Sequence, residues 1–324
     1  MTRKINWGII GLGNIAHLFA SDLMLSERST LRGVASRDLE KATEFGDQYH
    51  SVKCYGSYEE LADDPEVDVV YIATPHTFHC EQTLMCLEKG KAVLCEKPMG
   101  IRSAETEKMA EAARSRNLFL MEGMWTRFIP ATIKMLELLK SNTIGELLFI
   151  HADFGFKSDA SPDSRLYKRS LGGGSLLDIG VYPVYLSMLT LGLPAEIKAT
   201  ARMTDTKVDS YCSMLLNYDN DAKAVLESTF ETETPTEAVL YGSRGTLTLH
   251  SRFHHSERIT VKVGENVQQY DIPYMGNGYY HEIEEVNQCL IHQNTESDKL
   301  SLQTSLNLIK IIDNIKEEIG LTYS

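Results

Sequence analysis

Residues 7–16 read WGIIGLGNIA, and this stretch decides the fold. Its apolar first half is typical of a buried strand, and its second half begins an amphipathic helix. Gly11, Gly13 and Ala16 have the spacing of the dinucleotide-binding fingerprint, in which the third small residue is Gly or Ala. Gly11 permits a tight turn, Gly13 lets a pyrophosphate approach the backbone, and Ala16 lets helix and strand pack closely. The stretch therefore predicts a phosphate-binding turn, although ordinary turns also match so short a pattern.

The first third of the chain alternates apolar strands with amphipathic helices, which predicts a doubly wound parallel sheet. We assign residues 1–122 to this Rossmann domain. The expected strands are Ile5–Ile10, Leu31–Ala35, Val67–Thr74, Lys91–Cys95 and Leu118–Met121, and the expected helices are Ile15–Leu25, Leu39–Tyr49, Ser57–Ala62, Phe78–Glu88 and Ala104–Arg116. Ser57 and Glu60 have the spacing of a capping box.

The pattern changes near residue 123, and we assign residues 123–324 to a second, α+β domain. Strand follows strand between Glu196 and Ile272, and the connections are too short for helical crossovers. The second sheet is therefore expected to be large, open and mainly antiparallel. Its uncovered face predicts a homodimer. Two helices close the chain, and the last of them could pack back on the first domain.

Composition and net charge indicate which binding partners and which cell compartment to expect. The chain has 324 residues and a formal net charge of −13, which disfavours nucleic acid and anionic membrane surfaces. Its six cysteines show no CxxC pairing, which fits a reducing cytoplasm. We find no apolar run approaching the length of a membrane span and no signal peptide. A cytoplasmic protein with a small-molecule substrate is expected.

The residues at the end of the second strand indicate whether NADP or NAD is the preferred cofactor. An NAD site usually places an acid there, about 20 residues after the glycine turn, to accept from the ribose 2′-hydroxyl. This chain has Ser36 and Arg37, with Lys41 one helical turn beyond, and Arg suits a 2′-phosphate. NADP is the expected cofactor and NAD stays possible, because Asp38 could serve as the ribose acid or merely cap the next helix. The helix N-terminus at Asn14 and Ile15 would face the pyrophosphate.

Two further strand ends carry candidate site residues. Thr74, Pro75, His76 and His79 follow the strand that begins at Val67, and we expect this loop to wall the cofactor. A metal pair of the two histidines is the less favoured alternative, because no cluster of Cys or carboxylate ligands accompanies them. No metal is expected.

The next strand ends at Glu96 and Lys97, and a Lys held by a following Pro at this edge is positioned rather than solvated. An exposed loop lysine is the alternative. Further on, three glycines precede a helix on which Asp178 and Tyr182 are four residues apart and share a face. The pair could equally be a plain surface hydrogen bond.

The motifs GLGNIA, ATPH, CEKPMG, MEGMWTRF and GGGSLLDIGVY, in this order, resemble those of the Gfo/Idh/MocA oxidoreductases. Within that family the chain is most similar to the dimeric dihydrodiol dehydrogenase branch, also known as NADP-dependent D-xylose dehydrogenase. The resemblance implies that Lys97 lies near the nicotinamide and the substrate hydroxyl. It also implies that the family's D-x-x-x-H motif falls on Asp178 and Tyr182, with Tyr in place of His as in that branch.

The same resemblance supplies substrate residues. It implies an aromatic wall that includes Trp125 and Phe154, with Arg127 as a further pocket residue. Around Phe253 and Tyr279 the chain departs from the branch's aromatic pattern, so the substrate itself is left open between a sugar, a polyol and a trans-dihydrodiol.

We therefore expect an NADP-dependent dehydrogenase in which Tyr182 moves the hydroxyl proton, since the general acid/base must hydrogen-bond that oxygen. A nearby Lys97 ammonium would favour the phenolate, and Asp178 would orient Lys97 or a substrate hydroxyl. Lys97 is the rival proton carrier. The alternative functions are an NAD-dependent sugar or inositol dehydrogenase, an NAD-using glycosidase, and a non-catalytic NADP sensor.

Overall fold

A computed structural model describes residues 3–323, which divide into two compact units. Unit 1 contains the chain up to Trp125 together with Tyr274–Leu306, and unit 2 contains Thr126–Pro273 and the chain from Asn307 on. The sequence predicts two continuous segments instead. Tyr274–Leu306 returns to unit 1 because its helix buries polar and apolar groups there. Asn287, for example, accepts a hydrogen bond from the Trp7 indole at 3.0 Å.

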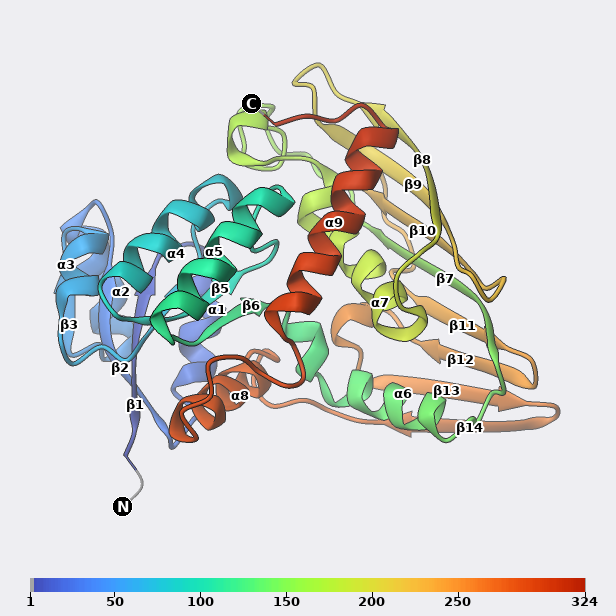
Figure 1. The fold of residues 1–324 in the computed structure, drawn as a ribbon, viewed down its shortest axis with the longest axis horizontal. Helices are drawn as coiled ribbons and strands as arrows, with labels where there is room; N and C mark the ends of the chain where they lie inside the picture. Colours follow the sequence, from blue (N-terminus) through green and yellow to red (C-terminus); the bar gives the residue numbers. More distant parts are fainter. Residues whose placement is uncertain (1–2, 324) are drawn as a thin grey trace. The chain divides into compact units, whose positions relative to one another are not determined.

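Unit 1 is the expected parallel sheet, with strand order β3-β2-β1-β4-β5-β6 (Figure 1). The strands are β1 (Ile5–Ile10), β2 (Ser29–Ala35), β3 (Lys53–Tyr55), β4 (Val69–Ile72), β5 (Ala92–Glu96) and β6 (Leu120–Gly123). The helices are α1 (Asn14–Leu23), α2 (Leu39–Tyr49), α3 (Tyr58–Asp63), α4 (His79–Glu88), α5 (Ser103–Arg116) and α8 (Tyr280–Ile291). No strand is predicted at β3, because its three half-exposed or exposed residues give no apolar period.

The two faces of this sheet bury different side chains. Val70 and Ile72 of β4 face an aliphatic core that α3, α4 and α5 complete. Tyr71, between them, points to the opposite face, where its ring stacks on Phe19 of α1 with the centroids 3.6 Å apart. This strict alternation is what a strand buried on both faces requires.

Unit 2 contains an eight-stranded sheet of order β14-β13-β12-β11-β7-β10-β9-β8. The strands are β7 (Leu147–Gly155), β8 (Glu196–Met203), β9 (Asp209–Asn217), β10 (Lys223–Thr229), β11 (Ala238–Gly242), β12 (Gly245–Leu249), β13 (Arg258–Val263) and β14 (Asn266–Asp271). Only the β7–β10 pair is parallel, so the prediction of a mainly antiparallel sheet is confirmed. The sequence analysis did not list β14, whose residues are almost all polar and exposed.

Helices α6 (Pro130–Lys140) and α7 (Val181–Leu191) run along one face of this sheet, and α9 (Leu302–Glu318) closes the chain (Figure 1). One stretch, Arg169–Leu191, is long and apolar enough by composition to cross a membrane, contrary to the expectation that no such run exists. However, 78% of its apolar window is buried inside the protein, as in the core helix of a globular domain.

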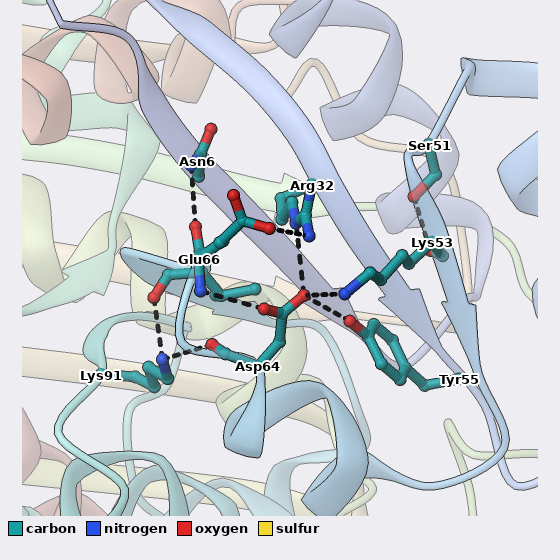
Figure 2. A network of polar contacts seen from close by, with 9 residues as sticks. Asn6, Arg32, Ser51, Lys53, Tyr55, Asp64, Glu66 and Lys91 are labelled. Atoms are coloured by element: carbon teal, nitrogen blue, oxygen red, sulfur yellow. Dashed lines mark hydrogen bonds and ion pairs between the residues drawn. The ribbon is translucent and has the colours of Figure 1, made fainter.

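A polar network centred on Asp64 ties the strands of unit 1 together near their amino ends (Figure 2). Its carboxylate accepts hydrogen bonds from Tyr55 at 2.5 Å, Arg32 at 3.2 Å and Lys53 at 3.3 Å. Burial alone would raise the pKa of Asp64, but these donors outweigh it and hold that pKa well below its usual range. Lys91 adds a bond to the Asp64 carbonyl at 2.5 Å. The charged groups of this network are therefore engaged in stabilising the fold, and they are not candidate catalytic residues.

We predict that Asp64→Asn lowers the free energy of unfolding by about 2–4 kcal/mol at pH 7, because it leaves three partly buried donors without their anionic acceptor. Since the folded-state pKa is depressed, the stabilisation is present above the unfolded-state value of about 3.9 and is lost as pH falls through the folded-state value. Urea unfolding of both proteins between pH 3 and 8 measures this. An equal difference at every pH would contradict the assignment.

Candidate functional site

The candidate site residues fall into two groups, one in each unit. In unit 1, Gly11 has φ +84°, and a Cβ there would lie 2.6 Å from the backbone of Ala73 and Thr74. Only glycine fits this contact between the ends of β1 and β4. A Cβ on Gly13 would meet no atom within 4 Å. Helix α1 has no side-chain cap, so the turn offers an open backbone face and helical N–H groups, including that of Ile15, that suit a pyrophosphate.

The structure distinguishes the two roles that the sequence allows for Asp38, which are ribose acid and helix cap. Asp38 caps α2 by accepting from the amides of Glu40 at 3.0 Å and Lys41 at 3.4 Å. Ser36 Oγ accepts from the Asp38 amide at 3.2 Å. The carboxylate of Asp38 is thus engaged in its own helix, and the Arg37 and Lys41 side chains are exposed beside it.

Arg37 also contacts Tyr58 of α3. Burial raises the pKa of the Tyr58 phenol, and the Arg37 guanidinium, which hydrogen-bonds it, opposes this rise. The cation is therefore held near the β2 end.

The loop after β4 is fixed by one histidine. His79 is fully buried, with Nε2 2.8 Å from the Thr74 carbonyl oxygen and Nδ1 2.9 Å from that of Pro98. It thereby joins the loop after β4 to the loop after β5. His76 is buried with its ring 5.7 Å from that of His79, and Pro75 precedes this 3₁₀ turn. Within residues 3–323, no group of three His, Cys, Asp or Glu side chains is placed to hold a metal ion.

Glu96 anchors the turn that carries Lys97. Its Oε2 accepts from the Lys97 amide at 3.1 Å, and its Oε1 accepts from the Tyr71 hydroxyl at 2.5 Å. Glu122 of β6 accepts from the Met99 amide at 2.8 Å. Two buried acids thus hold the backbone on either side of Pro98, while Lys97 itself is half-buried.

Trp125 is 7% exposed and stacks on Tyr279, with centroids 4.5 Å apart and planes 8° apart. The edge of Tyr279 also meets Phe19, at 6.2 Å. Tyr279 belongs to the late segment that returns to unit 1, so the aromatic wall implied for Trp125 is two rings thick. The sequence departs from the branch's pattern at this position, and only the fold reveals that Tyr279 contacts Trp125.

In unit 2, the glycine-rich stretch that begins at Gly172 is held in place by Asp209, a residue that no motif of the sequence indicated. Asp209 of β9 is fully buried and accepts from the Ser175 hydroxyl and the Leu176 amide, each at 2.7 Å. Gly174 has φ +118°, and a Cβ there would lie 2.3 Å from Asp209. The helix then starts as a π-helix, Leu176–Gly180.

This π-helix corrects one expectation. Asp178 is not on the α-helix that carries Tyr182, so the spacing-of-four argument for a shared face does not apply as stated. Asp178 forms an ion pair with Arg165 at 3.0 Å. Arg165 has no pattern in the sequence that identifies it as a site residue.

Tyr182 lies in a cluster of rings. Its centroid is 5.8 Å from that of Phe154 on β7 and 4.7 Å from that of His254. His254 also stacks on Phe154 at 4.4 Å. The structure therefore brings Phe154 and Tyr182 together, and His254 is a further member of this cluster that no motif of the sequence indicated. Arg127, half-buried in the 3₁₀ turn Trp125–Phe128, is not part of this ring cluster.

The glycine turn at the carboxyl edge of a parallel sheet, in a chain that also contains a large mainly antiparallel sheet, defines a class, the oxidoreductases that bind a nicotinamide dinucleotide on a Rossmann fold. Two family models match, one for the oxidoreductase family with NAD-binding Rossmann fold over residues 5–124, the other for the GFO/IDH/MocA C-terminal domain over residues 132–248. The chain belongs to the Gfo/Idh/MocA oxidoreductase family, which confirms the resemblance inferred from the motifs.

Relatives and solved structures agree with this assignment. The trans-1,2-dihydrobenzene-1,2-diol dehydrogenases of Xenopus tropicalis and Homo sapiens are each 36% identical, with 98% of both chains covered. KijD10, a 3-ketoreductase from Actinomadura kijaniata solved with NADP and TDP-benzene, is 25% identical with a TM-score of 0.88 and covers 98% of each chain. The aldose-aldose oxidoreductase of Caulobacter crescentus, at 24% identity and a TM-score of 0.90 over 98% of each chain, shares the fold.

We predict that Gly13→Ala weakens NADP binding about tenfold, a loss of about 1.4 kcal/mol, because the added methyl occupies the face that the pyrophosphate approaches. Gly13 has extended backbone angles that any residue adopts, so the free energy of unfolding should not change. Calorimetric titration with NADP and urea unfolding measure the two quantities. Gly11→Ala is the contrasting variant, since its strained backbone lowers stability as well. Unchanged affinity in Gly13→Ala would contradict the assignment.

Proposed function

We propose that this oxidoreductase is an NADP-dependent dehydrogenase that oxidises a secondary hydroxyl of a sugar or a trans-dihydrodiol. The observation that carries the cofactor preference is at the β2 end. Asp38 is engaged in capping α2, whereas Arg37 presents a guanidinium there. A planar guanidinium binds phosphate oxygens bidentately, which suits the 2′-phosphate of NADP better than the 2′-hydroxyl of NAD. NADP in the KijD10 structure supports the same preference.

The reaction sets a clear requirement for the protein. A bound oxidised nicotinamide would accept the hydride from the carbinol carbon, which becomes a carbonyl carbon. The protein must then take the hydroxyl proton, so a base has to hydrogen-bond that oxygen. Tyr182 is our candidate, because its ring packs against both Phe154 and His254, which fix its position. Lys97, whose backbone amide Glu96 fixes, is the second candidate.

The substrate class follows from the rings around these groups. Phe154 is a half-buried ring in unit 2, and a flat apolar surface of this kind suits the face of a six-membered ring. Asp178 with Arg165, and Arg127, add polar groups for further hydroxyls. The dihydrodiol dehydrogenase relatives support a cyclic diol, and a sugar has the same ring size and vicinal hydroxyls.

We predict that Tyr182→Phe lowers kcat by about 10²–10⁴-fold, because the phenol that receives the proton is lost while the ring stays in place. The NADP dissociation constant should be unchanged, which provides the control. The measurement is NADPH formation with a panel of aldoses, polyols and trans-diols. Near-normal turnover would remove Tyr182 from this role and leave Lys97 as the proton carrier.

We predict that Arg37→Ala raises the KM for NADP by about 10–100-fold, as expected for loss of a charge-assisted pair of hydrogen bonds. The KM for NAD should stay within about twofold, so the NAD assay is the matched control on the same protein. Steady-state kinetics with both cofactors and one substrate measure the ratio. Equal effects on the KM values of the two cofactors would contradict the assignment of Arg37 to the 2′-phosphate.

A further inference from the structure

Glu282, in the first turn of α8, is a buried acid that the proposed reaction does not use. It is fully buried, and neither carboxyl oxygen has a hydrogen-bond partner. Asp22, another buried acid of unit 1, has several hydrogen-bond donors. Asp22 accepts from the amides of Asn277 at 2.8 Å and Tyr280 at 3.1 Å. A buried carboxylate with no donor is strongly disfavoured, so Glu282 is expected to be neutral.

The neighbouring acid is Glu96, beside Lys97. Burial is the largest cause that raises the pKa of Glu282, and the charges of Glu96 and Asp22 raise it further. Tyr71 and Tyr279 are the other titratable groups in this cluster, and the Tyr71 phenol has its pKa raised by burial and by the same two glutamates. Two adjacent buried acids do not ionise together readily, so one of them keeps a proton.

Hydrogen bonding decides which acid carries the charge. Glu96 receives two donors, the Tyr71 hydroxyl at 2.5 Å and the Lys97 amide at 3.1 Å, and donors stabilise a carboxylate. Glu282 receives none. We propose that Glu282 is protonated in the folded protein and acts as a positioning residue for Lys97, because its neutral form leaves Glu96 as the charged anchor of the Lys97 turn. The protonation stands alone, whereas the role toward Lys97 rests on the proposed function.

The protonation of Glu282 predicts the direction in which the free energy of unfolding changes with pH. Because the folded-state pKa of Glu282 lies above the unfolded-state value of about 4.3, folding is favoured most below that pH and loses stability as pH rises toward the folded-state value. Glutamine copies the neutral carboxyl and cannot ionise. Glu282→Gln should therefore gain stability relative to the wild type as pH rises from 4.5 to 8.

The first experiment compares urea midpoints of the full chain at pH 4.5 and pH 8. Glu282→Gln is expected to unfold at higher urea than the wild type at pH 8 and at nearly the same urea at pH 4.5. Glu285→Gln, one turn along α8, is the matched control, because its carboxylate accepts from Ser297 at 2.6 Å and pairs with Lys299. It should lose stability at pH 8. A Glu282→Gln variant that is less stable than the wild type at pH 8 would overturn the proposal.

The second experiment detects the proton directly. Buried Glu122 and Asp209 also have raised pKa values, because burial outweighs their hydrogen bonds, so the wild-type infrared spectrum alone does not isolate Glu282. The difference spectrum of the wild type minus Glu282→Gln at pH 7 should contain the carbonyl stretch of one neutral carboxylic acid. A carboxylate band in its place would overturn the proposal. Glu282→Met, a neutral side chain of similar length, replaces the Gln variant if that does not fold.

The third experiment tests the role toward Lys97 through the pH profile of kcat/KM. Ionisation of Glu282 at alkaline pH would place a second charge beside Glu96, so the wild type should lose kcat/KM there and Glu282→Gln should retain it. Identical alkaline limbs in an active enzyme would overturn the positioning role. If no sugar or diol is oxidised, the proposed function and the role toward Lys97 fail together, while the urea and infrared results still decide the protonation.

Discussion

The close contact between the ends of β1 and β4 is the constraint on which unit 1 depends. Gly11 lies so near the backbone of Ala73 and Thr74 that a single methyl group would not fit. The sheet order places β2 on one side of β1 and β4 on the other, so the chain changes direction at this point. In such sheets, ligands bind at the carboxyl edge beside this switch. Arg37 follows β2, on one side of β1. Thr74 and Lys97 follow β4 and β5, on the other side, so the candidate cofactor residues lie on both sides of the Gly11 turn.

Buried polar side chains, more than apolar ones, fix the loops at that edge. His79 bridges the carbonyls of Thr74 and Pro98, and Glu96 receives the Lys97 amide. In unit 2, Asp209 does the same for the start of the second glycine stretch. These bonds are buried or partly buried, so losing one partner leaves the other unsatisfied and is therefore costly. Loops held in this way are preorganised to present Lys97 and Tyr182 without a large loss of entropy on binding.

Features encoded locally could be predicted from the sequence. The glycine turn, the β-branched strand β4 and the Ser57 cap, whose hydroxyl accepts from the Glu60 amide at 3.2 Å, depend on residues a few positions apart. The reciprocal Glu60 bond reaches the Gly56 amide, one residue earlier than a standard capping box. Contacts made across the chain could not be predicted. The return of α8 to unit 1 depends on pairs such as Trp7 with Asn287, which no local pattern encodes.

The same distinction applies to the candidate site. Lys97 and Tyr182 each belong to a short motif of the sequence, and the family resemblance implied Phe154, which lies outside those motifs. His254 and Asp209 come from strand connections and strands with no such stretch, and they join the site only when the sheet of unit 2 is formed. The π-helix Leu176–Gly180 is a further case: its first residue donates to Asp209, a contact from a distant strand that no local pattern encodes.

The acids of unit 1 show how the same side-chain type serves two purposes. Near the amino ends of the strands, Asp64 is surrounded by donors and stabilises the fold in its charged form. Glu96, at the end of β5, receives two donors and Glu282 of α8 has none, so Glu96 is the member of the pair that is favoured to carry the charge. A fold under selection for stability alone would replace Glu282 by an apolar residue, because a partnerless buried acid lowers stability at neutral pH. Its electrostatic interaction with Glu96, the residue before Lys97, therefore favours a functional reason over a structural one.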